Sequence, residues 1–481
     1  MASSEKKQIV GGIAWKMAER LTSQGVTFLV SIILARLLMP EEFGLVAMIQ
    51  VFIAVANIFV SVGISSSLIQ KKDADDLDFS TMFYCSLGLS VILYLVLFFT
   101  APFIAEFYKM PKLELIVRVY SLILILYSYN SIQNAWVSRH MVFKKFFLTT
   151  SFGTIGSGII GVILAYSGFG VWAIVAQTMS NTLINMFVMR CIVTWRPKLI
   201  FSFARAKKLM SYGLNILIAS LLGTGCNQIR QLVIGRYFSA ADLAFFNRGN
   251  QFPHLFLSNI DTTINTVLFP AMSNHSDDPD RVKAMTKKSI RISSYVLFFA
   301  MGSLAVCAEP LVRVLLTDKW IECVPFIQLI CVADMISTVS DANRQAIKAL
   351  GRSDISLKLE MLKKPVFLLM VFVSANISVM AMAVCMPLYS LYAAIVNMFP
   401  NKKLMKYGHL EQVKDFIPAA TLTLFMALVV YPISLLDLNE YFLLIIQITM
   451  CIVVYLGLSY LFKIESLGYI VSTLKEFRKK K

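Results

Sequence analysis

Fourteen apolar runs dominate the sequence, and most of them are long enough to cross a lipid bilayer. A membrane-spanning helix needs roughly 20 consecutive apolar residues. We predict such helices over residues 21–38, 45–69, 79–104, 115–137, 146–166, 171–194, 212–238, 252–272, 292–316, 323–346, 357–375, 377–399, 416–436 and 441–462. The sequence therefore predicts an all-α polytopic membrane protein.

Lysine and arginine are distributed unequally between the two sides of these runs. If the N-terminus is cytoplasmic, 36 of the 45 Lys and Arg fall on the cytoplasmic side, seven fall on the opposite side, and Arg118 and Arg230 lie within spans. Cytoplasmic loops of membrane proteins carry such an excess of basic residues. With fourteen spans, the bias predicts that both termini are cytoplasmic.

The least distinct boundary lies between the runs 357–375 and 377–399, which only Asn376 and Ser378 interrupt. Merging the two runs would give thirteen spans. It would also move Lys402, Lys403 and the terminal lysines to the outer side, against the charge bias. We therefore retain fourteen spans.

Composition argues against a water-soluble protein. Hydrophobic residues make up 57% of the 481 residues and charged residues only 15%, which leaves too little polar material to cover a soluble protein of this size. Membrane topology and anionic lipid headgroups explain the net charge of +17, so we do not expect nucleic-acid binding.

The cysteines and the connectors between the runs also indicate a membrane protein. The eight cysteines form no Cys-x-x-Cys pair and sit mostly in or beside apolar runs, as buried small hydrophobic residues do. The N-terminal segment lacks the pattern of a cleaved signal peptide, which favours an uncleaved first helix. No outer connector exceeds about a dozen residues. We expect the function to lie within the membrane, with neither a cofactor nor a metal.

The chain resembles itself when its numbering is shifted by 200 residues. Ile33–Arg36 match Val233–Arg236, and Gly25 matches Gly225. The alternative is a chance likeness between two apolar segments. The register predicts two pseudo-symmetric six-helix bundles in parallel orientation, residues 1–200 and 201–400, followed by two extra helices and a basic tail in residues 401–481. Such halves suit a transporter with a central site between them.

Several short stretches are similar to a known transporter family. They are Ala35–Leu45 (ARLLMPEEFGL), Val267–Ser273 (VLFPAMS), Ala308–Leu311 (AEPL), Thr317–Trp320 (TDKW) and Lys348–Asp354 (KALGRSD). Through them the chain resembles the Wzx-type flippases, the polysaccharide-transport branch of the multidrug/oligosaccharidyl-lipid/polysaccharide exporter superfamily.

This resemblance implies two six-helix bundles around a V-shaped cavity, in the inner membrane of a bacterium. It also implies a substrate, an undecaprenyl-diphosphate-linked oligosaccharide carried from the cytoplasmic to the periplasmic leaflet for O-antigen, capsule or exopolysaccharide assembly. The last two helices would add a groove for the polyprenyl tail, and a polysaccharide polymerase and a chain-length regulator are possible partners. The resemblance does not name the glycan.

One departure from the family concerns Arg230, which stands where relatives often carry an acidic or neutral polar residue. Cation-coupling schemes of the superfamily should therefore not be transferred to this chain. A diphosphate that crosses the hydrocarbon core needs a buried cation, because an isolated charge there is very costly. Arg230 lies in the middle of a span among polar neighbours, where exposure to lipid would cost about 2.5 to 3.5 kcal/mol.

We predict that Arg230 faces a cavity and clamps two phosphate oxygens, while Asn227 or Gln231 forms hydrogen bonds with sugar hydroxyls. The alternative is an interhelical ion pair between Arg230 and Asp261. Both arrangements can exist in different conformations.

Four further charged residues are candidates for the cavity wall. Arg20 is either an entry-side phosphate contact or a basic anchor at the cytoplasmic end of the first span, and Arg118 either lines the cavity or extends to the headgroups. Asp334 and Asp341 are seven residues apart, which places them on one helical face two turns apart. They indicate a water-lined wall or a proton relay, or alternatively hydrogen bonds between helices.

Two other functions were weighed. A polysaccharide polymerase or ligase shares the many-span architecture, but the chain offers no convincing catalytic set, so we do not expect an enzyme. A cation-coupled exporter of drugs or small molecules belongs to the same superfamily and shares its architecture, and the polysaccharide-branch stretches argue against it.

Overall fold

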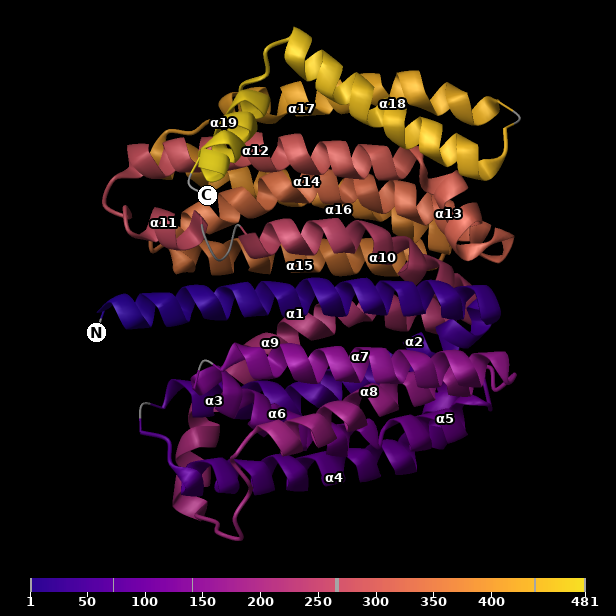
Figure 1. The fold of residues 1–481 in the computed structure, drawn as a ribbon, viewed down its shortest axis with the longest axis vertical. Helices are drawn as coiled ribbons and strands as arrows, with labels where there is room; N and C mark the ends of the chain where they lie inside the picture. Colours follow the sequence, from indigo (N-terminus) through magenta and orange to yellow (C-terminus); the bar gives the residue numbers. More distant parts are fainter. Residues whose placement is uncertain (1, 72, 141, 264–267, 437, 480–481) are drawn as a thin grey trace. The chain divides into compact units, whose positions relative to one another are not determined.

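The computed structural model describes residues 2–71, 73–140, 142–263, 268–436 and 438–479, and every regular element in these residues is a helix (Figure 1). Ten of the described helices are long and apolar enough to cross a membrane, or eleven if one bent pair counts as a single span. Large apolar side chains remain exposed along these helices, as expected where lipid replaces water. The chain is thus an all-α polytopic membrane protein.

Residues 1–244 form the first of two compact units. Its helices are α1 (Ala2–Leu37), α2 (Pro40–Asn57), a π-helical turn (Ile58–Val62), α3 (Gly63–Gln70), α4 (Asp76–Phe107), α5 (Leu113–Tyr120), α6 (Ile123–Arg139), α7 (Phe143–Tyr166), α8 (Val171–Ile192) and α9 (Phe203–Tyr237). Helix α7 packs between α1 and α8, and α6 packs against α4 and α8. Helix α9 crosses α2 and α3.

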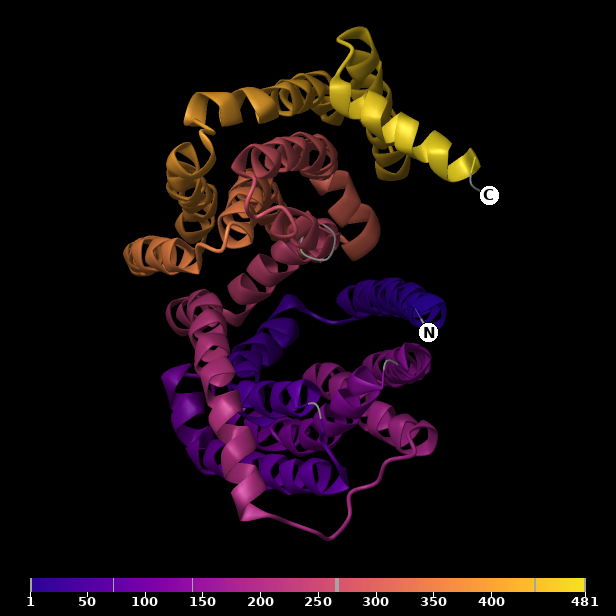
Figure 2. The ribbon, with the colours of Figure 1, turned by 90° about the vertical axis from the view of Figure 1, so that its left-hand side faces the viewer.

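Residues 245–481 form the second unit, and α10 (Ala240–Thr263) begins in the first unit and continues into the second. The other helices are α11 (Phe269–Ser273), α12 (Pro279–Val306), α13 (Ala308–Leu316), a 3-10 helix (Asp318–Cys323), α14 (Val324–Ala349), α15 (Ser353–Ala375), α16 (Val379–Met405), α17 (His409–Val430), a 3-10 helix (Tyr431–Leu435), α18 (Glu440–Leu461) and α19 (Glu465–Lys479). Helix α14 packs against α12 and α16, and α17 packs against α12 and α18. Figure 2 shows the last three helices grouped together, with α19 leading to the C-terminus.

The 200-residue repeat extends to the helix ends. Helix α1 ends at Leu37 and α9 at Tyr237, while α2 begins at Pro40 and α10 at Ala240. The capping contacts repeat as well, because Glu42 accepts a hydrogen bond from the backbone N–H of Met39 (2.9 Å) and Asp242 accepts one from Ser239 (3.0 Å). The shifted register therefore reflects a repeated helix–turn–helix.

The predicted spans coincide with helices or with helices interrupted by a short break. The span predicted at 45–69 contains the π-helical turn, and the spans at 115–137 and 292–316 are each divided between two helices. Part of the span predicted at 252–272 lies outside the described residues. The total of fourteen and the cytoplasmic position of both termini stay predictions.

In each unit, the connectors predicted to be cytoplasmic lie at one end. In the first unit, Lys198 pairs with Asp76 at 2.5 Å, and Arg139 donates a hydrogen bond to the backbone oxygen of Leu68 at 3.1 Å. In the second unit, Lys283 donates a hydrogen bond to the backbone oxygen of Lys406 at 2.9 Å. Each unit thus gathers basic connectors at one end, as the charge bias predicts.

Candidate functional site

The three polar residues predicted to contact the substrate lie on one stretch of α9. Arg230 and Gln231 are partly buried, whereas Asn227 is exposed. Residues three and four apart face the same side of a helix, so Asn227 shares a face with Arg230 and Gln231. The Nε atom of Arg230 is shielded from solvent. This stretch can supply one guanidinium and two amide groups to a single ligand.

Helix α9 bends by 49° between its segments Phe203–Ser211 and Ile216–Tyr237. Gly213 lies at the bend and meets Gly63 of α3 so closely that a Cβ atom on Gly213 would lie 2.5 Å from the Gly63 backbone oxygen. Gly63 itself directly follows the π-helical turn. Such turns interrupt the regular hydrogen-bond ladder and are frequent at functional sites. The bend of α9 and the π-helical turn thus lie beside the close contact between α9 and α3.

The other arginine candidates have different surroundings. Arg118 pairs with Glu114 of its own helix at 2.8 Å, and its Cζ atom lies 4.9 Å from the ring centre of Phe98. Arg20 is partly buried along α1. Asp261 belongs to α10, but its side chain lies outside the described residues, so its pairing with Arg230 stays a prediction.

The two aspartates predicted on one helix both lie on α14. Asp334 is partly buried, and its backbone oxygen accepts hydrogen bonds from Ser337 (2.9 Å) and Thr338 (3.0 Å). Asp341 pairs with Arg344 at 2.5 Å. Its carboxylate also interacts electrostatically with Lys363 of α15.

Sequence reasoning missed the charged cluster that surrounds Asp341. Lys363 pairs with Glu360 at 2.7 Å, and its side chain is only 6% exposed. Lys348 and Arg344 add two cations from α14. The signal was present, since Glu360 and Lys363 interrupt an otherwise apolar run.

Side-chain amides join α14 to α16 in the second unit. Asn397 donates a hydrogen bond to the Ser340 hydroxyl at 2.7 Å, and Asn401 donates one to the Asn343 side chain at 2.5 Å. Asn343 in turn donates to the backbone oxygen of Val339 at 2.8 Å. All four side chains in these two contacts are buried, so the bonds position α16 against the helix that carries Asp341.

We expect Ser340→Ala to lower the stability of the protein by about 0.6 to 1.7 kcal/mol, the range for hydrogen bonds between membrane helices. The loss arises because the Asn397 amide is left without this acceptor in a buried position. Thermal unfolding of the purified protein in detergent measures the change. Ser337→Ala is the matched control, because the Ser337 hydroxyl bonds only within its own helix at Asp334. Equal melting temperatures for the two variants would contradict the role of Ser340.

A comparable network joins α6, α7 and α8 in the first unit. Asn130 donates a hydrogen bond to the backbone oxygen of Thr182 at 3.0 Å. Asn181 donates to the Ser157 hydroxyl at 3.1 Å and accepts a hydrogen bond from Asn185 at 2.9 Å. These hydrogen bonds between neutral groups link the three helices, as polar residues commonly do within a membrane protein.

Ion pairs at the basic end of the first unit hold α4 to α9. The Asp78 side chain is fully buried and lies 2.5 Å from the Lys71 ammonium and 3.3 Å from the Arg205 guanidinium. Arg205 also pairs with Asp75 at 2.6 Å, and this hydrogen bond lowers the pKa of the Asp75 carboxyl to about 2. Asp75 is therefore ionised at neutral pH, and the contact between α4 and the first turn of α9 is an ionic one.

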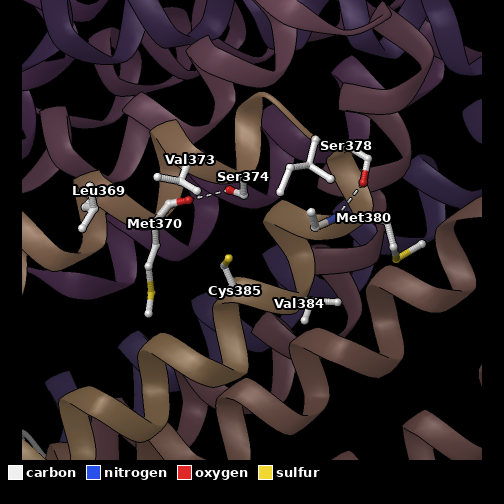
Figure 3. A pocket seen from close by; sticks show the side chains of 10 residues that line it. Leu369, Met370, Val373, Ser374, Ser378, Met380, Val384 and Cys385 are labelled. Carbon is white, nitrogen blue, oxygen red and sulfur yellow. Dashed lines mark hydrogen bonds between the residues drawn. The ribbon is translucent and has the colours of Figure 1, made fainter.

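Apart from these polar groups, an apolar cavity of about 580 Å³ lies beside the turn between α15 and α16 (Figure 3). Leu369, Val373 and Val384 line it, and the hydroxyls of Ser374 and Ser378 are hydrogen-bonded to Met370 and Ala381 of the surrounding backbone. The cavity fits a hydrocarbon chain and offers no charge for a phosphate. Among the described residues, no group of three or more His, Cys, Asp and Glu side chains could hold a metal ion.

The sequence is similar to a known protein family and to named proteins of that kind. A family profile described as "Polysaccharide biosynthesis protein" matches residues 33–325. The succinoglycan biosynthesis transport protein ExoT of Rhizobium meliloti is 23% identical over 346 residues, which are 72% of this chain and 70% of ExoT. The lipopolysaccharide biosynthesis protein WzxC of Escherichia coli is 22% identical over 400 residues, 82% of this chain and 80% of WzxC.

The fold is also similar to solved transporter structures. The lipid II flippase MurJ, in an inward closed conformation, matches with a TM-score of 0.76 at 14% identity, covering 94% of this chain and 98% of MurJ. An inward-facing multidrug resistance MATE transporter of the MOP superfamily matches with a TM-score of 0.63 at 14% identity, covering 81% of this chain and 98% of the transporter. At these identities the likeness concerns the fold alone.

Proposed function

Because this chain belongs to the polysaccharide biosynthesis protein family, we propose that it is a flippase of the inner membrane that moves a lipid-linked oligosaccharide from the cytoplasmic to the periplasmic leaflet. The names of its relatives support this proposal, since ExoT is named for succinoglycan biosynthesis transport and WzxC for lipopolysaccharide biosynthesis. The flippase fold is consistent with a transporter that breaks no bond.

The proposed lipid carrier is undecaprenyl diphosphate, and the proposed mechanism is alternating access. Arg230 would neutralise the diphosphate, because a guanidinium can donate two parallel hydrogen bonds to phosphate oxygens. Asn227 and Gln231 lie on the same face of α9 and would contact the sugar. The bend at Gly213 and the π-helical turn would allow α9 to change direction during transport. Asp261, Arg20, Arg118, Asp334 and Asp341 stay secondary candidates.

A polysaccharide polymerase and a chain-length regulator are proposed partners, since the flipped oligosaccharide must be consumed on the periplasmic side. No cofactor is needed for this activity. The cation-coupled exporter stays the second candidate, because the multidrug transporters share the fold.

Mass spectrometry of lipid-linked oligosaccharides tests the function. In cells that lack the protein, we expect one undecaprenyl-diphosphate oligosaccharide to accumulate on the cytoplasmic side, because nothing removes it. Re-expression of the wild-type chain should restore the normal level, and the accumulated species names the cargo. An unchanged lipid profile in cells without a redundant flippase, together with altered drug susceptibility, would favour the exporter.

A further inference from the structure

A polar cavity of about 250 Å³ opens at the basic end of the second unit, where α17 begins and α18 turns into α19. None of the residues of the charged cluster of α14 and α15 lines it. Five charged side chains line it, namely those of Arg291, Lys414, Asp415, Lys463 and Glu465. Three of them are basic and two are acidic, so the cavity carries an excess of positive charge.

The two acidic residues are already occupied by structural contacts. The side chain of Asp415 is only 2% exposed, and it accepts hydrogen bonds from Arg291 Nε (2.7 Å) and from the Tyr407 hydroxyl (2.6 Å). Glu465 forms an ion pair with the same Arg291. Arg291 therefore holds α17 and α19 to α12, and its charge is balanced within the protein.

The two lysines have a different environment. Both Lys414 and Lys463 are exposed, and among the described contacts neither ammonium takes part in an ion pair or a side-chain hydrogen bond. Lys463 has φ of 51°, a left-handed conformation that usually favours glycine. It stands just before the first turn of the 15-residue helix α19, whose N-terminal dipole adds to the positive potential.

The neighbouring residues place the cavity at the level of the lipid headgroups. Tyr460, Leu461 and Phe462 directly precede Lys463 and are 79%, 72% and 70% exposed. Aromatic residues are enriched at the boundary between hydrocarbon and water, and basic residues at the cytoplasmic side. On its inner side, α19 packs through Leu467 and Ile470 against the core of this unit. The cavity thus has apolar surface on one side and unneutralised lysines on the other.

We propose that this cavity binds the phosphate group of an anionic glycerophospholipid of the cytoplasmic leaflet, whose acyl chains lie along the exposed apolar face of α18. Lys414 and Lys463 supply the positive charge for the phosphate. Arg291 does not supply it, because its guanidinium is already paired with two carboxylates. An ammonium is a compact charge suited to a phosphate oxygen. The site is independent of the proposed transport function.

Lipid titration of the full-length protein in detergent tests the site. Dioleoylphosphatidylglycerol should bind and raise the unfolding temperature, with retained lipid counted by native mass spectrometry. Dioleoylphosphatidylcholine, which has the same acyl chains without net charge, should do so at least tenfold more weakly. Each basic residue near an anionic lipid contributes on the order of fivefold in affinity.

Variants separate the cavity from a general attraction to basic surface. Lys414→Gln combined with Lys463→Gly removes both ammonium groups, and the glycine retains the left-handed turn. We expect this double variant to bind phosphatidylglycerol at least about tenfold more weakly than the wild type. The double variant Lys414→Arg with Lys463→Arg keeps both positive charges and should bind like the wild type. The matched control is Lys402→Gln with Lys403→Gln, two exposed lysines of α16 that do not line the cavity.

Three results would overturn the proposal. The first is equal binding of the two lipids, and the second is an equal loss in the control variant. The third is full displacement of phosphatidylglycerol by inorganic phosphate at matched ionic strength, which would identify a soluble phosphate as the ligand. None of these measurements depends on transport, so a failure of this proposal can be distinguished from a failure of the flippase proposal.

Discussion

Gly44→Ala should sharply reduce the yield of folded protein and lower its unfolding temperature. A Cβ atom on Gly44 would lie 1.8 Å from the backbone oxygen of Ala240, so helices α2 and α10 meet there without room for a methyl group. The obstacle is backbone, which cannot move aside as the end of a flexible side chain can. Overpacking of this kind costs about 1 to 3 kcal/mol or more.

Gly25→Ala is the matched control for this prediction. Gly25 also lies within a helix, but a Cβ atom there meets nothing within 4 Å. Alanine favours the helix over glycine by about 0.5 to 1 kcal/mol, so this variant should be as stable as the wild type or slightly more stable. Size-exclusion profiles and thermal unfolding in detergent measure both variants. Equal melting temperatures for Gly44→Ala and Gly25→Ala would contradict the close contact between α2 and α10 at Gly44.

Arg230→Gln should abolish display of the surface polysaccharide while the protein still inserts into the membrane. Glutamine keeps the polar character of the α9 stretch but removes the cation that would balance the diphosphate. Hydrogen bonds to charged groups contribute about 1.5 to 3 kcal/mol, which corresponds to a loss of transport on the order of 10- to 100-fold. Arg230→Lys keeps the charge without the two-pronged geometry and should retain part of the activity.

The control for Arg230 is Arg236→Gln. Arg236 is also an arginine of α9, but its Cζ atom lies 5.1 Å from the ring centre of Phe107. We expect near-normal display from this variant at equal membrane abundance. The lipid-linked oligosaccharide should accumulate in Arg230→Gln cells only. Full polysaccharide display by Arg230→Gln would contradict the role of this residue as a phosphate clamp.

The helices were predictable because their causes are local. A run of apolar residues of sufficient length defines a span, and Pro40 marks the start of α2 just as the 200-residue register places the start of α10 at Ala240. The helices extend beyond the apolar runs, since charged residues continue a helix into water without interrupting its hydrogen bonds. This is why α1 begins at Ala2 rather than at the predicted residue 21.

The pairings between side chains were not predictable from one sequence. Asn401 bonds Asn343, 58 residues away, and Arg205 bonds Asp75, 130 residues away, with no local pattern that connects them. Asp341 is visible in the sequence as a carboxylate within an apolar run, but its neighbours on α15 depend on how two helices pack. The ion pair of Arg118, in contrast, was predictable from the sequence. Its partner Glu114 lies four positions earlier, and this spacing brings two side chains together on one face of a helix.

Two contacts between helices, one in each unit, are made by different kinds of group. In the first unit, the bonds among α6, α7 and α8 are made by amides and hydroxyls, which neither gain nor lose a proton at physiological pH. In the second, α14 faces α15 through carboxylates and ammonium groups. Acid stress would therefore act on the contact between α14 and α15, whose carboxylates can take up protons, and would leave the bonds among α6, α7 and α8 unaltered.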